Sequence, residues 1–180
     1  MAISPNGRKY IAYSGIIESH HWYIALCYSC NDNWITLILD DSFISHTDPD
    51  SIYIDQDGNF HILVHAYSDY RQVVYYWGTP ENWSLKFFPE ILYYGGRGEL
   101  TGDPDGNICI AFGKDPGYPS YGVFYMQVND GNWSEPTKIS DYHYPNFVRV
   151  TLDAYDNPFV SWMRDYEFGL YEIDYAYSKP

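Results

Sequence analysis

Four arginines are the first residues in this chain whose chemistry suggests a ligand, because only ten of its 180 residues are Lys or Arg. These four arginines lie in or next to the loops between the apolar runs of the sequence, and other polar and aromatic residues occur in the same loops. The candidate ligand-binding residues are Trp22, Tyr70, Arg71, Arg97, Glu99, Tyr118, Arg149 and Arg164. A guanidinium binds a carboxylate through two parallel hydrogen bonds, and a flat ring can stack on a sugar. We therefore expect a carboxylate-bearing sugar. Local salt bridges with Asp69, Glu99 and Asp165 are the alternative.

Two acidic turns raise the question of a metal site. Asp55 to Asn59 and Asp103 to Asn107 alternate carboxylates in the manner of a calcium loop. Such a loop also needs a bidentate glutamate about 12 residues after its first ligand, but Ala66 and Lys114 stand at those positions. Asp and Asn also favour turns by bonding to their own backbone. We expect structural turns, no metal and no cofactor.

The cysteines do not indicate a metal site or a disulfide framework either. Cys27 and Cys30 have the spacing of a zinc knuckle, but no second pair follows, and their side chains point to opposite faces of a strand. We expect one buried thiol and one thiol near a turn, with Cys109 alone. Three cysteines form no even disulfide framework.

The elements that hold these residues repeat about every fifty residues. The turn residues Gly7, Gly58, Gly106 and Asp156 mark four copies, and each of the first three copies closes on a tryptophan: Trp34, Trp83 and Trp133. Short alternating apolar runs broken by Gly, Pro, Asn and Asp are typical of strands and turns. The second copy predicts strands at 50–54, 60–66, 72–77 and 83–88, and the third predicts strands at 101–103, 108–113, 121–128 and 133–139. We expect the tryptophans to pack between neighbouring sheets.

Units of this length with four short strands are the size of propeller blades. The expected fold is therefore all-β, a single domain over residues 1–180 with blades of four antiparallel strands at about 1–45, 46–95, 96–144 and 145–180. The last blade lacks its outer strand in this sequence. A shorter-repeat β-solenoid and a β-sandwich are the alternative architectures. Further blades or a second copy would complete the ring, because an open ring leaves edges exposed.

Composition excludes several classes of partner. The net charge is −14, and nucleic acids and anionic membrane surfaces need a positive face. No apolar run approaches the roughly 20 residues of a membrane span. The first residues lack the basic and apolar parts of a signal peptide, so either the protein is cytosolic or an export signal lies outside this sequence. The 21 tyrosines suit strands and sugar-binding surfaces.

The repeated Asp-x-Asp-Gly-Asn turn, apolar strand, tyrosine-rich strand and Asn-Trp resemble the BNR-like repeats of sialidase-type propellers and of secreted bacterial lectin propellers. The likeness covers nearly the whole chain and implies a propeller. The Asp130–Trp133 spacing differs from that of a sialidase Asp-box, so sialidase activity is not implied. A narrower resemblance, to BNR-type polysaccharide lyases, covers His46, the turn at Asp55, His61, His65 and Tyr75.

Three functions follow as expectations. The first is an extracellular or cell-surface lectin-like module. The second, implied by the lyase resemblance, is an enzyme with His65 or His46 as base, Tyr75 or Tyr67 as acid, and Arg71 offsetting the charge of a uronate carboxylate. A polysaccharide lyase or glycosidase-like activity would use these groups. The third is a non-catalytic scaffold in a surface assembly.

Overall fold

The computed structural model describes most of the chain in separate stretches. These are residues 1–18, 21–31, 33–43, 47–67, 71–88, 98–103, 105–114, 121–129, 131–141, 145–166 and 170–177. For residues 43, 67, 71, 72, 87, 88, 146, 165, 166, 170 and 171 the description extends to the backbone only. Within these ranges no helix has the length and hydropathy that crossing a membrane requires.

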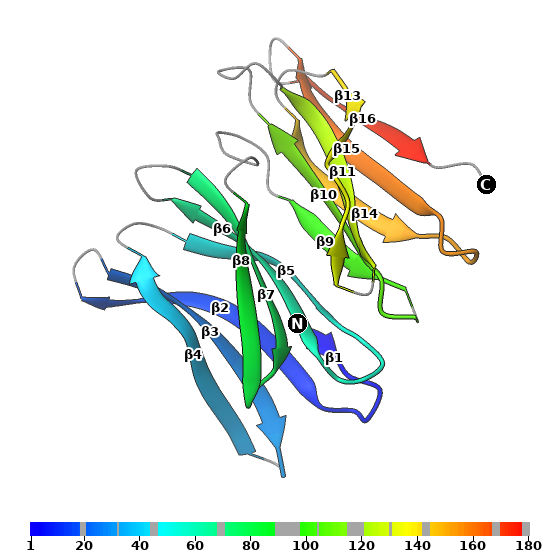
Figure 1. Cartoon of the computed structure of the whole chain (residues 1–180). Coiled ribbons are helices and arrows are strands. Elements are labelled where there is room, and N and C mark those ends of the chain that lie inside the picture. Colours follow the sequence, from blue (N-terminus) through cyan, green and yellow to red (C-terminus); the bar gives the residue numbers. More distant parts are fainter. Residues whose placement is uncertain are drawn as a thin grey trace. The chain divides into compact units, whose positions relative to one another are not determined.

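The described strands form four antiparallel sheets, and the chain divides into two compact units, Met1–Leu92 and Tyr93–Pro180 (Figure 1). Sheet I consists of β1 (Ala2–Ile3), β2 (Lys9–Glu18), β3 (His21–Cys30) and β4 (Asn33–Phe43). Sheet II consists of β5 (Thr47–Ile54), β6 (Phe60–Tyr67), β7 (Arg71–Thr79) and β8 (Asn82–Phe88). Sheet III consists of β9 (Glu99–Gly102), β10 (Ile108–Lys114) and β11 (Gly122–Asn129), with β12 (Asn132–Trp133) and β13 (Thr137–Ser140) both on β11. Sheet IV consists of β14 (Asn146–Leu152), β15 (Pro158–Tyr166) and β16 (Leu170–Tyr177).

The all-β prediction is confirmed, and the predicted strands are present with shifted ends. The strand expected at 50–54 begins three residues earlier, at Thr47. The strand expected at 133–139 is wrong as a single element, because it is divided into β12 and β13. Ser134, Glu135 and Pro136 separate the two, and proline has no N–H to give to a ladder. Sheet IV has three described strands.

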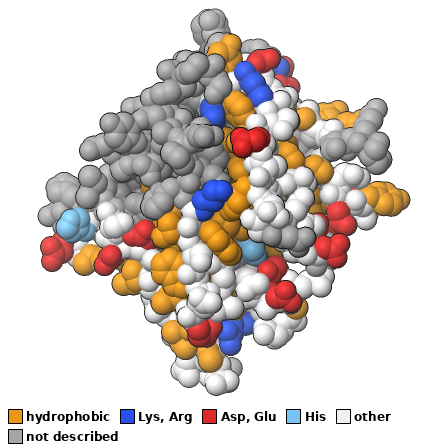
Figure 2. Space-filling model, viewed as in Figure 1, with side chains coloured by type: hydrophobic (Ala, Val, Ile, Leu, Met, Phe, Trp, Pro, Cys, Tyr) orange, Lys and Arg blue, Asp and Glu red, His pale blue; other side chains and the backbone are white. Residues whose placement is uncertain are grey.

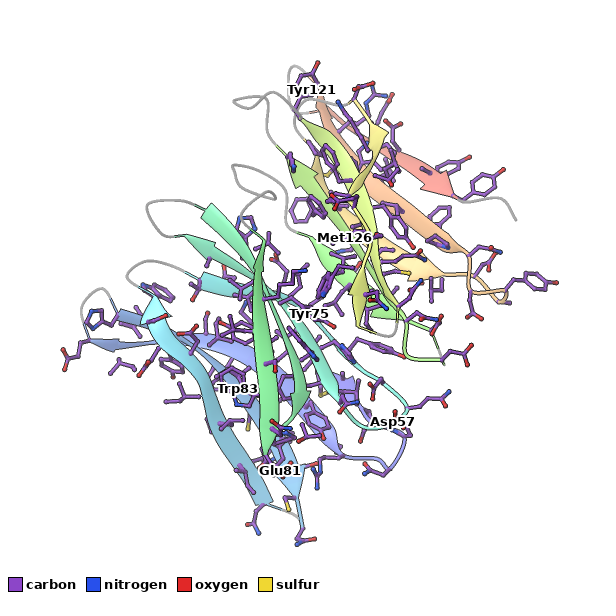
Figure 3. The ribbon with its side chains drawn as sticks, in the orientation of Figure 1. Asp57, Tyr75, Glu81, Trp83, Tyr121 and Met126 are labelled. Carbon is purple, nitrogen blue, oxygen red and sulfur yellow. The ribbon has the colours of Figure 1, made fainter. Side chains whose placement is uncertain are left out.

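The turn prediction is confirmed in atomic detail. Asp55 accepts hydrogen bonds from the backbone N and the side-chain Nδ2 of Asn59, both at 2.8 Å. Gly58 lies between them at φ +85°, a conformation that a β-carbon would strain. The pairs Asp103–Asn107 and Asp153–Asn157 repeat this clamp. The first carboxylate of each turn is therefore occupied by N–H donors of its own hairpin, which stabilises the connection between two strands. Asp57 and Glu81 lie at the tips of the β5–β6 and β7–β8 hairpins of sheet II (Figure 3).

These turns give each sheet two faces that can be compared between repeats. We name one face of each sheet the front face. It carries the residue six positions after the residue that begins the turn. The turns begin at Ser4, Asp55, Asp103 and Asp153, and the corresponding front-face residues are Tyr10, His61, Cys109 and Phe159. The back face carries the fifth and seventh residues. Lys9, Phe60, Ile108 and Pro158 are the fifth residues.

In the first unit, the front face of sheet I packs on the back face of sheet II. Tyr10 and Leu26 of sheet I belong to one buried cluster with Phe60, Ile62 and Val64 of sheet II. Phe60, Ile62 and Val64 are all 0% exposed, and burying such a side chain contributes roughly 1.5–3 kcal/mol. This core holds the two sheets face to face.

The second unit uses the same pair of faces. Cys109 and Ala111, on the front of sheet III, pack against Val150, Val160 and Trp162, on the back of sheet IV. The same head-to-tail contact therefore occurs in both units. The remaining faces differ: the front of sheet II is buried at Leu63, while the front of sheet IV exposes 63% of Tyr175.

The expectation that all three repeat tryptophans pack between sheets is wrong for Trp34. Trp83 lies on the back of sheet II, packs against the first core and has its ring centroid 5.9 Å from that of Tyr76 (Figure 3). Trp34 is 50% exposed, and Trp133 is partly exposed. The reason is position: Trp34 lies on the back of sheet I, and within the first unit only the front of that sheet is covered by sheet II. The predicted buried thiol in the first copy is also wrong, since Cys27 and Cys30 are both half-buried.

Candidate functional site

Several residues predicted from the sequence lie outside the described part of the chain. These are His46, Tyr70, Arg97 and Tyr118. Arg71 begins β7, but its side chain is not described. Trp22 is partly buried and packs against the core of the first unit. The lyase roles of His46, His65, Arg71 and Tyr75 therefore stay predictions.

The two described arginines of the predicted ligand surface lie beside carboxylates of their own unit. Glu99 accepts a hydrogen bond from the backbone N of Val150 at 3.1 Å, and its Oε2 lies 4.0 Å from Nε of Arg149. Arg164 Nη1 lies 3.0 Å from Oδ2 of Asp174. Local ion pairs, the alternative explanation for these arginines, are thus present for both. For Arg164 one described partner is Asp174 on the neighbouring strand, and the side chain of Asp165 is not described.

The proposed base His65 is a buried residue of β6 that pairs with Asp48, near the start of β5. It is 7% exposed, and its Nδ1 lies 3.7 Å from Oδ2 of Asp50. Thr47, at the first position of β5, is 0% exposed. His65 and the proposed acid Tyr75 share the front face of sheet II, because His65 pairs with Val73 across β6 and β7 and Leu63 pairs with Tyr75.

The histidine that contacts Tyr75 is His61. The hydroxyl of Tyr75 lies 2.5 Å from Nδ1 of His61, and Nε2 of His61 lies 3.2 Å from Oδ2 of Asp55. All three groups are satisfied when Tyr75 donates to Nδ1 and His61 donates from Nε2 to Asp55. Tyr75 is only 2% exposed, so this Asp–His–Tyr chain has the connectivity of a proton relay without access for a substrate.

Burial shifts the pKa values of the groups in this hydrogen-bonded chain. It lowers the pKa of His61, and the neighbouring Asp55 only partly opposes that effect. Burial also raises the pKa of Tyr75, and the charge of Asp55 adds to the rise. For Asp55 burial favours a higher pKa, but hydrogen bonds from Asn59 and His61 outweigh it and hold the pKa of Asp55 below its usual value. The folded state therefore contains neutral His61 and ionised Asp55.

This arrangement predicts a stability that decreases with acidification. Because the pKa of His61 is lower in the folded than in the unfolded protein, neutral His61 contributes to stability in full above the unfolded pKa of 6.5. This contribution is lost as the pH falls below 6.5. Asp55 adds a second loss below its unfolded value of 3.8. We expect urea midpoints to fall between pH 7.5 and pH 5 and the variant His61→Cys to weaken this dependence. The variant copies the third repeat, where Cys109 Sγ lies 3.0 Å from the hydroxyl of Tyr125. Equal pH dependence in both proteins would contradict the assignment to His61.

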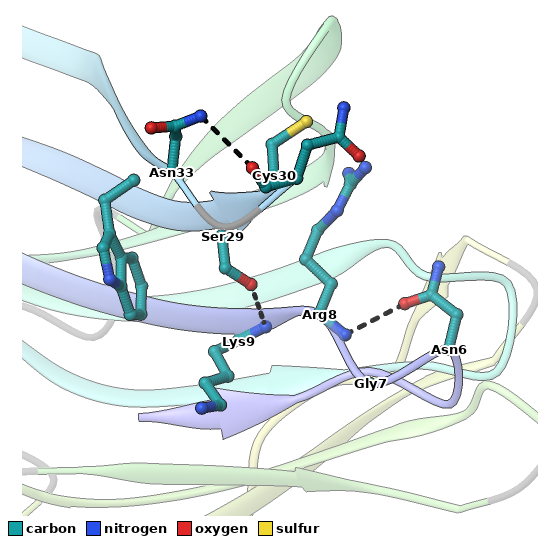
Figure 4. Close-up of a pocket in the computed structure, with 9 residues that line it drawn as sticks. Asn6, Gly7, Arg8, Lys9, Ser29, Cys30 and Asn33 are labelled. Atoms are coloured by element: carbon teal, nitrogen blue, oxygen red, sulfur yellow. Dashed lines mark hydrogen bonds between the residues drawn. The ribbon is translucent and has the colours of Figure 1, made fainter.

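A solvent-accessible site lies at the turn end of sheet I. A cavity of about 610 Å³ opens between the β1–β2 turn and the β3–β4 turn (Figure 4). Its lining residues are Asn6, Gly7, Arg8, Lys9, Ser29, Cys30, Asn31, Asn33 and Trp34. Among these described lining residues there is no Asp or Glu, although the chain has 24 acidic residues. The lining combines two cations, several amides and an indole that is half exposed.

Local hydrogen bonds hold this cavity in shape. Ser29 Oγ accepts from the backbone N of Lys9 at 2.9 Å and so ties the two turns together (Figure 4). Asn6 Oδ1 accepts from the backbone N of Arg8 at 3.1 Å. The guanidinium of Arg8 lies over the ring of Tyr28, 5.5 Å from its centroid, and a hydrogen bond to Tyr10 raises the pKa of Arg8. Arg8 therefore carries its charge at neutral pH.

Sequence reasoning missed Arg8 and Lys9 as site residues and took Trp34 for a core residue. A signal was present in the alignment of the repeats. At the two positions where the first copy has Arg8 and Lys9, the second has Asn59 and Phe60. Phe60 is 0% exposed, whereas Lys9 is exposed. A change from a buried ring to a cation at one repeat position identifies a face that meets water.

The surroundings make a cationic cavity unusual on this protein. On the face drawn in Figure 2, the few basic side chains are separated from one another, and some of them lie beside acidic side chains. The described residues contain no group of three or more His, Cys, Asp or Glu side chains placed to hold a metal ion. The cavity between the turns of sheet I is therefore suited to a polar ligand that carries negative charge.

Comparison with known proteins identifies a protein with a similar fold but indicates no activity. No protein-family model matches the chain, and no curated protein sequence matches it. A crystal structure of a protein of unknown function from Dyadobacter fermentans DSM 18053 superposes with a TM-score of 0.66 at 12% sequence identity. The match covers 97% of this chain and 64% of that one, so this chain spans less than two thirds of the neighbour's length. At this level of identity the likeness shows that the two chains share a fold.

Proposed function

We propose that this chain is a carbohydrate-binding protein of the β-propeller type, and that the cavity between the turns of sheet I binds an acidic sugar. The observation that carries the proposal is the composition of the cavity: Arg8, Lys9 and the half-exposed Trp34 line one space, and its described lining residues include no Asp or Glu. An indole offers a flat apolar face to a sugar ring, and a guanidinium binds a carboxylate or sulfate.

The size and polarity of the cavity support this ligand class. A volume of about 610 Å³ is within the range of small-molecule sites, which usually occupy roughly 300–1,000 Å³. Asn6, Asn31 and Asn33 provide amide groups that both donate and accept hydrogen bonds, as sugar hydroxyls require. The positive charge of Arg8 and Lys9 at this site also favours anionic over neutral sugars.

The propeller assignment has two supports. First, each unit packs the front of one sheet on the back of the next, and a head-to-tail contact that repeats forms either a ring or an open stack. Second, since 97% of 180 residues corresponds to 64% of the Dyadobacter neighbour, that chain has about 270 residues. The additional hundred or so residues equal about two further repeats of this length. Both observations are compatible with the BNR-like propellers that the repeat motif resembles.

The test is binding to a glycan array that includes uronic-acid and sulfated oligosaccharides, followed by calorimetry with the best ligand. We expect Arg8→Gln to weaken binding at least about tenfold, because a charged hydrogen bond contributes about 1.5–3 kcal/mol. We expect Trp34→Ala, which removes the flat apolar face for the sugar ring, to weaken binding at least about tenfold as well. Raising the salt concentration should weaken binding by the wild type, since screening reduces the attraction of exposed charges.

Matched controls separate this cavity from the surface predicted from the sequence alone. Tyr155→Ala removes another exposed ring, one that is 85% exposed, and should leave affinity unchanged. Arg149→Gln tests the predicted loop surface. Binding that is lost in Arg149→Gln but retained in Arg8→Gln would move the site to that surface. No binding to any acidic or neutral glycan would contradict the lectin proposal.

A further inference from the structure

The β1–β2 turn has the same backbone frame as the equivalent turn of the second copy. Gly7 N donates to the carbonyl oxygen of Ser4 at 2.9 Å, and Gly58 N donates to that of Asp55 at 3.1 Å. The φ angles of Gly7 and Gly58 are nearly equal, +83° and +85°. A difference in chemistry between the two turns therefore comes from their side chains.

The charge of this turn is inverted in the first copy. The second and third copies have carboxylates at the first and third turn positions and an amide at the fifth: Asp55, Asp57 and Asn59, then Asp103, Asp105 and Asn107. The first copy has Ser4, Asn6 and Arg8 at these positions. Two carboxylates give the other turns a formal charge of −2, whereas one guanidinium gives the first turn +1. Asn6 and Arg8 both line the cavity of the proposed sugar site.

The hydrogen bonds that close the turn have also moved from one residue to another. In the second copy, Asp55 accepts from both the backbone N and the side-chain Nδ2 of Asn59, so the side chain at the fifth position is part of the clamp. In the first copy, Oδ1 of Asn6 accepts from the backbone N of Arg8 at 3.1 Å (Figure 4) and from Oγ of Ser4 at 2.6 Å. Asn6 thus supplies the acceptor, and the turn closes without the side chain of Arg8.

These bonds fix the orientation of the Asn6 amide. The backbone N–H of Arg8 is a donor, so the amide atom that faces it is the oxygen and not the nitrogen. Nδ2, which can only donate, then forms the other arm of the amide. Together with the guanidinium of Arg8, it places two groups of N–H donors in the lining of the cavity. Such donors match the oxygens of a carboxylate or a sulfate.

Two tyrosines hold the guanidinium of Arg8 at this turn. It lies over the ring of Tyr28, and the rings of Tyr28 and Tyr10 are stacked with their centroids 6.1 Å apart. The hydrogen bond to Tyr10 is the largest cause of the raised pKa of Arg8, and the charge of Glu81 adds a smaller rise. The guanidinium is therefore held mainly by neutral groups, and its charge can serve an anionic ligand.

We propose that the β1–β2 turn binds the acid group of the sugar, and that Asn6 is the residue that makes the site select an anionic ligand. This inference rests on the proposed function, because it assigns one part of the same cavity. The Asn6 amide provides donors without a negative charge. An aspartate, as at positions 57 and 105, keeps the turn but places a carboxylate beside the incoming anion, and like charges repel.

Asn6→Asp tests this assignment with a side chain of the same shape. It retains an oxygen for the backbone N of Arg8, so thermal unfolding should be unchanged. Calorimetry with a galacturonic-acid hexasaccharide should show at least about tenfold weaker binding than the wild type, because a charged hydrogen bond is replaced by repulsion. The carboxyl-reduced hexasaccharide is neutral and should bind both proteins equally. Gln56→Glu is the matched control, because it adds the same charge at an exposed position in the turn of the second copy.

Inorganic sulfate separates this inference from the lectin proposal. In heteronuclear NMR spectra of the full chain, sodium sulfate should cause saturable shifts of the Gly7 and Arg8 amide signals in the wild type and in Gln56→Glu, and none in Asn6→Asp. No saturable shift in the wild type, or an equal shift in Asn6→Asp, overturns the inference. Sulfate binding at this turn without binding of any glycan would retain the anion site and contradict the lectin proposal. Glycan binding that is equal in the wild type and Asn6→Asp would overturn the role of Asn6 and leave the lectin proposal intact.

Discussion

Phe60→Lys is expected to unfold the first unit, whereas Lys9→Phe is expected to leave its stability almost unchanged. The two residues occupy the same position of consecutive repeats, the fifth after the first turn residue. Phe60 is 0% exposed and belongs to the core between sheets I and II. Lys9 is exposed on the back of sheet I, at the edge of the candidate sugar site. One substitution therefore buries a charge, and the other places a ring in contact with water.

The expected magnitude of the first effect is comparable to the whole stability of a small domain. Removing a buried phenylalanine side chain costs about 3–5 kcal/mol, and an unpaired buried ammonium adds several more. Typical domains have only about 5–15 kcal/mol in total. Hydrogen exchange read peptide by peptide should show lost protection in β2–β8 of Phe60→Lys and normal protection in Lys9→Phe. Normal protection of β6 in Phe60→Lys would contradict the assigned packing of sheet II.

Asp55→Ala is expected to destabilise the first unit by about 3 kcal/mol. Its carboxylate holds the turn through two bonds to Asn59 and also accepts from Nε2 of His61. Hydrogen bonds to charged groups contribute about 1.5–3 kcal/mol, and a buried donor that loses its partner adds a further cost. Asp55 is 7% exposed, so water replaces these bonds poorly. Urea unfolding followed by tryptophan fluorescence measures the loss.

The repeats supply the control series for this prediction. Asp103→Ala removes the same two turn bonds to Asn107, but Cys109 stands where the second repeat has His61, so the loss should be smaller. Asp153→Ala removes an exposed clamp to Asn157 and should have the smallest effect, because water can replace those bonds. An equal loss in all three variants would show that His61 adds nothing to the role of Asp55.

The position of each sheet within its unit explains why equal repeat positions have different roles. Trp83 and Trp34 both follow an asparagine at the start of a fourth strand. Sheet I covers the back of sheet II, and Trp83 packs there, whereas within the unit only the front of sheet I is covered by sheet II. Trp34 is consequently half exposed and lines a cavity with Arg8 and Lys9. In this way a repeat built for packing can supply a binding surface at a face that its unit leaves open.

The sequence by itself determined the strands, their turns and the repeat. Alternation of apolar residues and the recurring Asp-x-Asp-Gly-Asn turn are local signals, and Gly58 at φ +85° with the Asp55–Asn59 clamp has the predicted geometry. Local signals suffice there because a hairpin is stabilised by residues that are neighbours in the chain.

Only the tertiary structure decided which face of each sheet is covered. The alternation in β6 places Phe60 and His61 on opposite faces, but it does not state which neighbour each face meets. That choice separated the core residue Trp83 from the exposed Trp34, and it made His61, rather than His65, the partner of Tyr75. It also revealed the cavity beside Lys9. The physical reason is that burial depends on contacts between residues far apart in sequence, which a repeat pattern leaves undetermined.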